Sequence, residues 1–306
     1  MAELSKDKFK IIGCDNLDAE GILRPSMTYW QDAWRRLKKN KVAIVSLVLL
    51  AIMCIMVVIG PWIARFEYNI GDGKVLNQGP NGVHWFGTDT LGRDLFARVW
   101  VGGRISIAIG IIGAIVDTVI GVMYGGIAGF KGGLVDDIMM RIVEILGSIP
   151  YLVLVILIRV IFNQGGIFPL VLAMTITGWT GMARLVRGQI LQIKEQEYVL
   201  AAKALGANTS RIIAKHLVPN TLGVMIVAIT MDIPSFIFGE AFLSFLGLGI
   251  QSPMTSWGAL ASAGQQQMMF YPYQLIFPAL AISIVMLSFQ LFGDGLRDAL
   301  DPKLRQ

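Results

Sequence analysis

The chain is poor in charged residues and in the residue types that hold metals. Only 15% of its 306 residues are Asp, Glu, Lys or Arg, against about 25% in an ordinary soluble domain. It has two cysteines and two histidines, which excludes a disulfide scaffold and a cysteine-based zinc site. It has no Gly-x-x-x-x-Gly-Lys-Ser/Thr motif, so it cannot cradle nucleotide phosphates by that route. These absences argue against most soluble enzymes and against a P-loop ATPase.

Apolar residues fill the space that charge leaves. They make up 55% of the chain, and its mean hydropathy is +0.63. A membrane-spanning helix needs about 20 mostly apolar residues, and six segments come close to or exceed that length: 42–64, 105–130, 145–161, 167–183, 221–245 and 274–293. The third helix is expected to begin earlier, near Leu134. The sequence therefore predicts an all-α integral membrane protein with six transmembrane helices.

Lysine and arginine are unevenly distributed between the predicted loops. Twenty lie on the side that holds residues 1–41, the loop before the third span, the loop 184–220 and the tail; six lie on the other side. Because cytoplasmic loops are richer in Lys and Arg, both termini are expected in the cytoplasm of a prokaryotic cell. Residues 1–41 are polar, so the first apolar run reads as an uncleaved span rather than a signal peptide. This charge bias accounts for the pI near 9.2 and leaves lipid, not nucleic acid, as the expected surroundings.

The spans divide the chain into five regions. Residues 1–41 form a cytoplasmic segment, 42–64 the first transmembrane helix, 65–103 an extracytoplasmic loop, 104–293 a five-helix core and 294–306 a cytoplasmic tail. Within the extracytoplasmic loop, Thr88 or Asp89 is expected to cap a short amphipathic helix that runs through Leu95 and Trp100.

The core contains one large cytoplasmic segment, 189–219. Helix-forming residues run from Glu197 to a candidate C-cap at Gly206. Asn208 or Thr209 then caps a second predicted helix, 210–217, which Pro219 is expected to end. Small side chains at Ala201 and Ala202 would let a partner approach closely, as a knob seats in a groove. An ordinary polar loop between two spans is the alternative, and the pattern alone leaves both open.

Several runs follow one another in a recognisable order. They are 29–37 (YWQDAWRRL), 86–94 (FGTDTLGRD), 98–106 (RVWVGGRIS), 134–141 (LVDDIMMR) followed by Pro150, 244–249 (SFLGLG) followed by Pro253 and Trp257-Gly258, and 293–302 (GDGLRDALDP). Together they resemble the C-type permeases of the peptide and nickel subfamily of type I ABC importers. The resemblance covers roughly residues 29–306.

The cytoplasmic segment is similar to the coupling motif of the same family. That motif reads Glu-Ala-Ala, three residues, Gly, nine residues, Ile, any residue, Leu-Pro. Ala201, Ala202, Gly206 and Pro219 stand at the family spacing. The sequence departs from the motif at its Glu, Ile and Leu positions, where it has Leu200, His216 and Val218.

The resemblance implies a type I importer fold and a set of partners. These are a homologous B-type permease that completes a heterodimer, two ATP-binding subunits in the cytoplasm and an extracytoplasmic substrate-binding protein. No cofactor is expected on this chain, because ATP and Mg²⁺ would bind the partner ATPases. Coupling to them is assigned to Glu197, Tyr198, Ala201, Ala202, Gly206 and Pro219. Peptides, with oligopeptides first, are the implied cargo; dipeptides and nickel complexes are the alternatives.

Three acidic residues lie inside predicted spans. Asp117, Asp232 and Glu240 need partners or water, because a charge at the bilayer centre costs about 2.5–3.5 kcal/mol on insertion scales. They could line a polar path for zwitterionic peptides, or make interhelical hydrogen bonds or meet a counter-charge on a partner. Near the inner face, Asp137 and Arg141 are spaced for an ion pair. Arg159 is expected to extend to the outer interface.

Three other classes of protein remain as alternatives. An ATP-independent channel would need a pore-lining ring. An intramembrane enzyme would need a nucleophile–base pair or a motif such as His-Glu-x-x-His, and neither occurs in the sequence. A purely structural membrane subunit would need no site at all. The two-helix cytoplasmic segment favours the transport subunit over all three.

Overall fold

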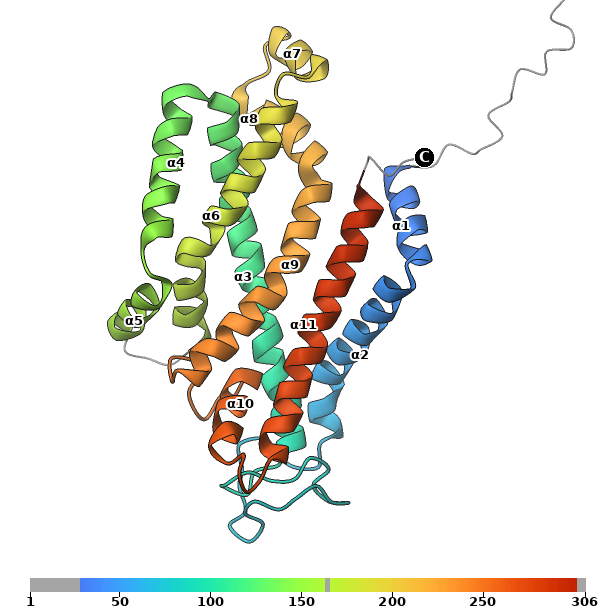
Figure 1. The fold of residues 1–306 in the computed structure, drawn as a ribbon, viewed down its shortest axis with the longest axis vertical. Coiled ribbons are helices and arrows are strands. Elements are labelled where there is room, and N and C mark those ends of the chain that lie inside the picture. The colour runs from blue at the N-terminus through green and yellow to red at the C-terminus, as the bar shows by residue number, and fades with distance from the viewer. Residues whose placement is uncertain (1–27, 163–165, 302–306) are drawn as a thin grey trace, which may run out of the picture.

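The protein is a bundle of long helices in a computed structural model that describes residues 28–162 and 166–301 (Figure 1). The elements in chain order are α1 (Tyr29–Lys39), α2 (Lys41–Ile63), α3 (Leu95–Lys131), α4 (Gly133–Ser148), α5 (Tyr151–Phe162), α6 (Ile167–Ile193), α7 (Glu197–Ala204), α8 (Thr209–Ile212), the π-helical turn η3 (Ile213–Leu217), α9 (Val218–Phe245), α10 (Trp257–Gln266) and α11 (Tyr273–Leu300). Most of residues 1–41 and the end of the predicted tail, with Lys303 and Arg305, lie outside the described residues. The all-α prediction is confirmed.

Five helical stretches are individually long and apolar enough to cross a membrane. They are α2, α3, α6, the continuous stretch Thr209–Phe245 and α11. The third predicted span is wrong as a single helix, because α4 and α5 meet at an angle of 81°. Pro150 causes the break: proline lacks an N–H and disfavours helical geometry in the residue before it, and Ile149 is extended, with ψ 127°. The count is six only if this bent pair makes one crossing.

The second span begins earlier than predicted. The separate amphipathic helix in the outer loop does not exist, because its residues form the first turns of α3, and the predicted boundary at residue 103 falls inside that helix. Asp94, not Thr88 or Asp89, caps it by accepting the N–H of Ala97 at 2.8 Å. Arg104 interrupts the apolar pattern but not the helix, since its guanidinium donates to the carbonyl oxygens of Val57 and Val58 on α2.

Two predicted helix ends are also wrong. Pro219 does not end the second cytoplasmic helix; it lies directly after the π-helical turn η3, inside the continuous helical stretch Thr209–Phe245. Helix α11 continues to Leu300, so the first residues of the predicted tail are helical. In that last part, Gly295 lies against Ala43 of α2, and Tyr29 of α1 donates to the carbonyl oxygen of Leu300 at 3.0 Å.

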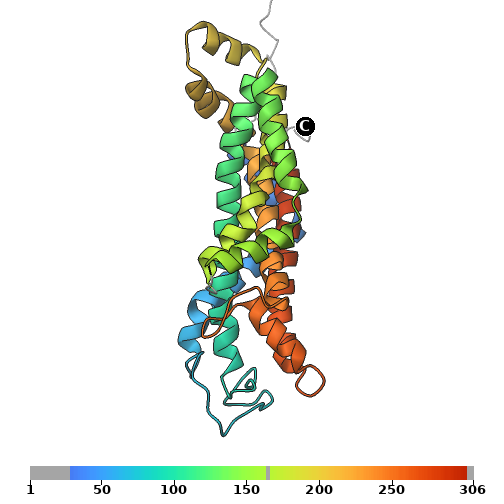
Figure 2. The ribbon, with the colours of Figure 1, turned by 90° about the vertical axis from the view of Figure 1, so that its left-hand side faces the viewer.

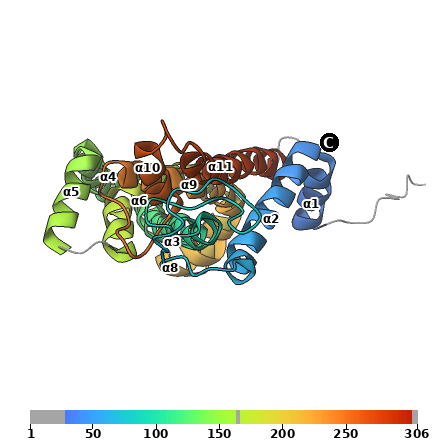
Figure 3. The same cartoon turned by 90° about the horizontal axis from the view of Figure 1, so that it is seen from below.

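The elements are sorted between the two ends of the bundle. Figure 1 shows α7, the start of α1 and the end of α11 at one end, with the loop after α2 and α10 at the other. Figure 2 shows α7 and α8 projecting sideways beyond the bundle. Seen from below, α5 and α2 lie on opposite flanks, with α3, α6 and α9 between them (Figure 3). The predicted cytoplasmic elements thus share one end of the molecule.

Glycines let α3 approach α6 closely. Gly121, Gly125 and Gly129 recur every four residues and therefore share one face of α3. A Cβ on Gly121 would lie 2.6 Å from the Cβ of Met182, and one on Gly125 would lie 2.2 Å from the carbonyl oxygen of Ala183. Small residues at this spacing are the usual means by which membrane helices bring their backbones together.

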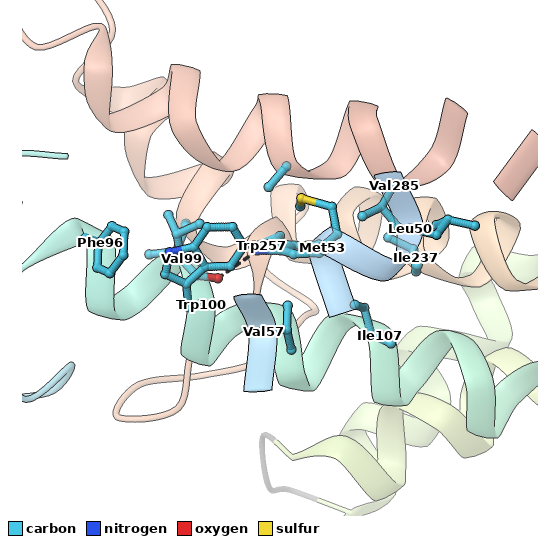
Figure 4. Packing of buried hydrophobic residues seen from close by; sticks show 12 residues of the cluster. Leu50, Met53, Val57, Phe96, Val99, Trp100, Ile107, Ile237, Trp257 and Val285 are labelled. Atoms are coloured by element: carbon cyan, nitrogen blue, oxygen red, sulfur yellow. Dashed lines mark hydrogen bonds between the residues drawn. The ribbon is translucent and has the colours of Figure 1, made fainter. Parts of the chain in front are cut away.

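Aromatic and aliphatic side chains fill the part of the bundle next to α10 (Figure 4). Trp257 of α10 is fully buried there among residues of α2, α3, α9 and α11. Its indole N–H donates to the carbonyl oxygen of Val99 at 2.8 Å, which satisfies the one polar group of the ring. The short helix α10 is therefore anchored in the core rather than lying on the surface.

A buried carboxylate joins α3, α9 and α10. Glu240 is fully buried and accepts hydrogen bonds from the hydroxyls of Ser106 (3.1 Å), Ser244 (2.7 Å) and Ser256 (2.6 Å), and from the backbone N–H of Gly258. Ser256 is also the N-cap of α10, so the negative charge lies at the favourable end of that helix. Glu240 is satisfied within the chain, as the hydrogen-bonding interpretation of this residue expected.

The glycine face of α3 gives a first prediction. Gly125→Ala should disrupt the bundle, because the new Cβ would overlap the backbone of Ala183. Gly126→Ala is the matched control, since its Cβ would meet only the side-chain ends of Ile213 at 3.4 Å and Ile190 at 3.7 Å. Yield of folded, monodisperse protein in detergent should fall severalfold for the first variant and stay near wild type for the second. Equal yields of the two would contradict this packing.

The Glu240 contacts give a second prediction. Glu240→Ala should lower stability by on the order of 3 kcal/mol, because each buried donor left without its acceptor costs about 1–3 kcal/mol. Glu195→Ala removes an exposed carboxylate and serves as the control. The midpoint of thermal unfolding in detergent, followed by tryptophan fluorescence, should drop by several degrees for the first variant alone. Identical midpoints would show that the serine contacts do not stabilise the protein.

Candidate functional site

The projecting segment is a two-helix corner built on one glycine. Helix α7 ends in a Schellman motif: the N–H of Ala207 donates to the carbonyl of Ala202, and that of Gly206 donates to the carbonyl of Lys203, each at 3.0 Å. Gly206 has φ +81°, a conformation that glycine adopts without steric cost. Asn208 then caps α8 by accepting the N–H of Arg211 at 2.8 Å. The predicted stop and restart of the helix therefore coincide with the observed ones.

One side of this corner belongs to the bundle core. Val199 of α7 is buried in a cluster with Ile190 of α6, Ile212 of α8 and Leu217 of η3. The same cluster includes Met182 and Met225, so it joins α7 to both α6 and α9. The buried side of α7 is therefore in one close-packed cluster with the two long helices.

The other side of the corner is apolar and unpartnered among the described residues. Leu205, at the turn, is 88% exposed, and Leu200 is 51% exposed. Tyr198 and Ala201 are also exposed. Several exposed apolar side chains at the tip of a projecting segment are typical of an interaction site.

The structure gathers most of the predicted coupling residues on this corner. Glu197 and Tyr198 lie exposed in the first turn of α7, Ala201 is exposed, Ala202 is half-buried and Gly206 forms the turn. Pro219 is separated from them, because it follows α8 and η3 and lies in the first turn of α9. The sequence analysis missed Leu205, because local pattern does not reveal that this leucine is exposed at the turn.

Two of the three intramembrane acids share a hollow. Asp117 of α3 and Asp232 of α9 line an open cavity of about 310 Å³, which Tyr151 of α5 and Gly178 of α6 also border. Asp117 is only 4% exposed, and among the described residues its Oδ1 has no hydrogen-bond partner. Glu240 does not line this cavity; it is enclosed by the serines of α3, α9 and α10.

The charged residues near the end of the bundle that carries α7 pair differently from the prediction. Arg187 of α6 contacts both carboxylate oxygens of Asp136 at 2.5 Å, and Arg141 pairs with Glu144 at 2.7 Å rather than with Asp137. The Asp136–Arg187 pair joins residues 51 positions apart, so no local spacing could reveal it. Near the other end, Arg159 donates to the carbonyl oxygen of Gly249 at 2.7 Å, which ties α5 to the loop after α9.

Two family models match the chain. The binding-protein-dependent transport system inner membrane component matches residues 121–306, which include the projecting corner and every lining residue of the acidic hollow except Asp117. The N-terminal transmembrane domain of oligopeptide transport permease C matches residues 28–80.

Curated relatives and a solved structure agree with these matches. The chain is 49% identical to the oligopeptide transport system permease protein OppC of Bacillus subtilis (strain 168), over the full length of both. It is 52% identical to the dipeptide transport system permease protein DppC of the same organism, covering 95% of this chain and 91% of the relative. A chain of the MetNI methionine ABC transporter, solved in inward-facing conformations, has the same fold at 21% identity, with a TM-score of 0.55 over 68% of this chain and 98% of that one. The chain belongs to the family of binding-protein-dependent transport system inner membrane components, in its branch of C-type oligopeptide and dipeptide ABC permeases.

Proposed function

We propose that the chain is one of two permease subunits of an ATP-driven peptide importer, with oligopeptides as its main cargo. It would pair with a homologous B-type permease, receive peptide from an extracytoplasmic binding protein and take energy from two cytoplasmic ATPase subunits. The observation that carries the proposal is the projecting corner, which is exposed on one side and packed against α6 and α9 on the other. The relatives named as oligopeptide and dipeptide permeases support the choice of cargo.

Coupling would work through that corner as a lever. An ATPase that binds Tyr198, Leu200 and Leu205 would displace α7. Because Val199 of α7 is packed in one cluster with residues of α6 and α9, these two helices would be displaced with it. Rigid-body tilting of packed helices is a common form of alternating access. Small residues at Ala201 and Ala202 would let the ATPase approach the backbone of α7.

The acidic hollow would form part of the path. It lies among α3, α5, α6 and α9, and α6 and α9 are the helices that the corner would move. A polar surface inside a membrane bundle is expensive and is a functional candidate by default. The proposal also places the end with α7 in the cytoplasm, in line with the excess of Lys and Arg expected there.

An uptake experiment tests the function and the cargo. Cells that lack the gene should lose uptake of labelled tri- and pentapeptides, and the intact gene should restore it. Labelled dipeptides and nickel serve as the comparison cargoes, and ATP depletion separates an importer from a channel. A chain with no effect on any peptide would contradict the proposal, and uptake that survives ATP depletion would favour the channel.

A substitution in the corner tests the coupling. Ala202→Glu should reduce coupled peptide uptake at least tenfold while leaving membrane insertion intact, because a charged side chain would hold the ATPase away from α7. Gln192→Glu adds the same charge at an exposed position on α6 and should keep uptake near wild type. ATP hydrolysis should stop responding to loaded binding protein in the first variant only. Normal uptake in Ala202→Glu would exclude close docking at this alanine.

A further inference from the structure

The hollow that Asp117 and Asp232 share has a one-sided charge. Two carboxylates line it, and no lysine, arginine or histidine is among its described lining residues. Tyr151 and Phe236 add aromatic rings to the lining, and aromatic faces attract cations. A low-dielectric cavity with charges of one sign concentrates the opposite charge, so the chemistry of this hollow favours a cation and disfavours an anion.

Asp117 is nearly buried in this hollow, and one of its two carboxyl oxygens has no hydrogen-bond partner among the described residues. It is 4% exposed, and its Oδ1 has no donor; a buried unpaired carboxylate is strongly unfavourable. Gly178 makes room for it, because a Cβ there would lie 2.1 Å from Oδ2. The chain thus keeps space for a carboxyl group of which one oxygen has no donor among the described residues, whereas it surrounds Glu240 with four donors.

We propose that the Asp117–Asp232 hollow is a subsite that receives the ammonium group of a passing peptide. An ammonium group offers three N–H donors, and charge-assisted bonds to carboxylates are stronger than neutral ones. A hollow of about 310 Å³ is at the small end of ligand pockets, so it takes one end of a peptide rather than a whole oligopeptide. The α-amino group and a lysine side chain carry the same chemistry.

This inference rests on the proposed function, and it is tested in the complete transporter. The complex, purified with its partner subunits and reconstituted in liposomes, is supplied with binding protein loaded with labelled trialanine. Peptide delivered and ATP hydrolysed are both measured for Asp232→Asn, Asp117→Asn and the charge-retaining Asp232→Glu. Asp298→Asn, which neutralises an exposed carboxylate at the end of α11, is the matched control. N-acetylated trialanine and an N-acetylated peptide that contains one lysine are the comparison cargoes.

The two Asn variants should deliver about tenfold less trialanine per ATP, while loaded binding protein still stimulates ATP hydrolysis. Asp232→Glu should keep at least half of wild-type delivery, and Asp298→Asn should be unchanged. Delivery of N-acetylated trialanine should be the same in all variants. If, of the two acetylated peptides, only the one with lysine is delivered less by the Asn variants, the site accepts either ammonium source. If the wild type does not carry the acetylated peptides, the inference is decided by trialanine delivery alone, compared between Asp232→Asn and Asp232→Glu.

Two results would overturn the inference. One is unchanged delivery of trialanine in both Asn variants. The other is an equal fall for Asp232→Asn and Asp232→Glu, which would show that shape and not charge matters at this position. Neither result touches the proposed importer function, which fails only if the wild-type complex delivers no peptide.

Discussion

The close approach of α3 and α6 is the constraint on which the rest of the bundle depends. Gly121, Gly125 and Gly129 bring the backbones of the two helices into contact, since between membrane helices packing replaces the hydrophobic effect as the driving force. Helix α3 also packs on α9, where Gly113 lies against Phe236. With α6 and α9 both fixed to α3, the hollow between them has a defined shape, and its carboxylates have defined places.

Buried polar groups divide into two kinds with different consequences. Glu240 has four donors and joins α3, α9 and α10 into one unit at the end of the bundle opposite the projecting corner. Asp117, eleven residues after Ser106 on the same helix α3, has an oxygen with no donor in the described chain. The first arrangement stabilises a fold; the second leaves a group for something else to satisfy. Two buried acidic residues thus have different interpretations: the surroundings of Glu240 indicate a structural role, and those of Asp117 indicate a binding role.

The corner at Gly206 projects beyond the bundle (Figure 2) and is connected to this interior by its packing. Leu200 and Leu205 are exposed on it, and its buried Val199 ties it to the cluster beneath. One side of the corner is thus exposed and open to a partner. Its other side is packed against α6 and α9, which border the hollow. The same geometry would serve poorly in a channel gated without a partner on this side.

The sequence by itself determined the class of the protein, most of its spans and the corner. Runs of apolar residues predict helices because hydrocarbon leaves backbone groups no other partners, and Gly206 with Asn208 marks the corner because capping is local. Boundaries failed where tertiary contacts override local pattern: Arg104 is tolerated in α3 because carbonyls of α2 accept its hydrogen bonds. Only the tertiary structure separated Glu240 from Asp117 and Asp232 and paired Asp136 with Arg187, because these relations join residues far apart in the chain. Sequence spacing predicts contacts only between residues near each other in the chain. Tertiary packing therefore decides which acidic residue has hydrogen-bond donors around it and which has an oxygen without one.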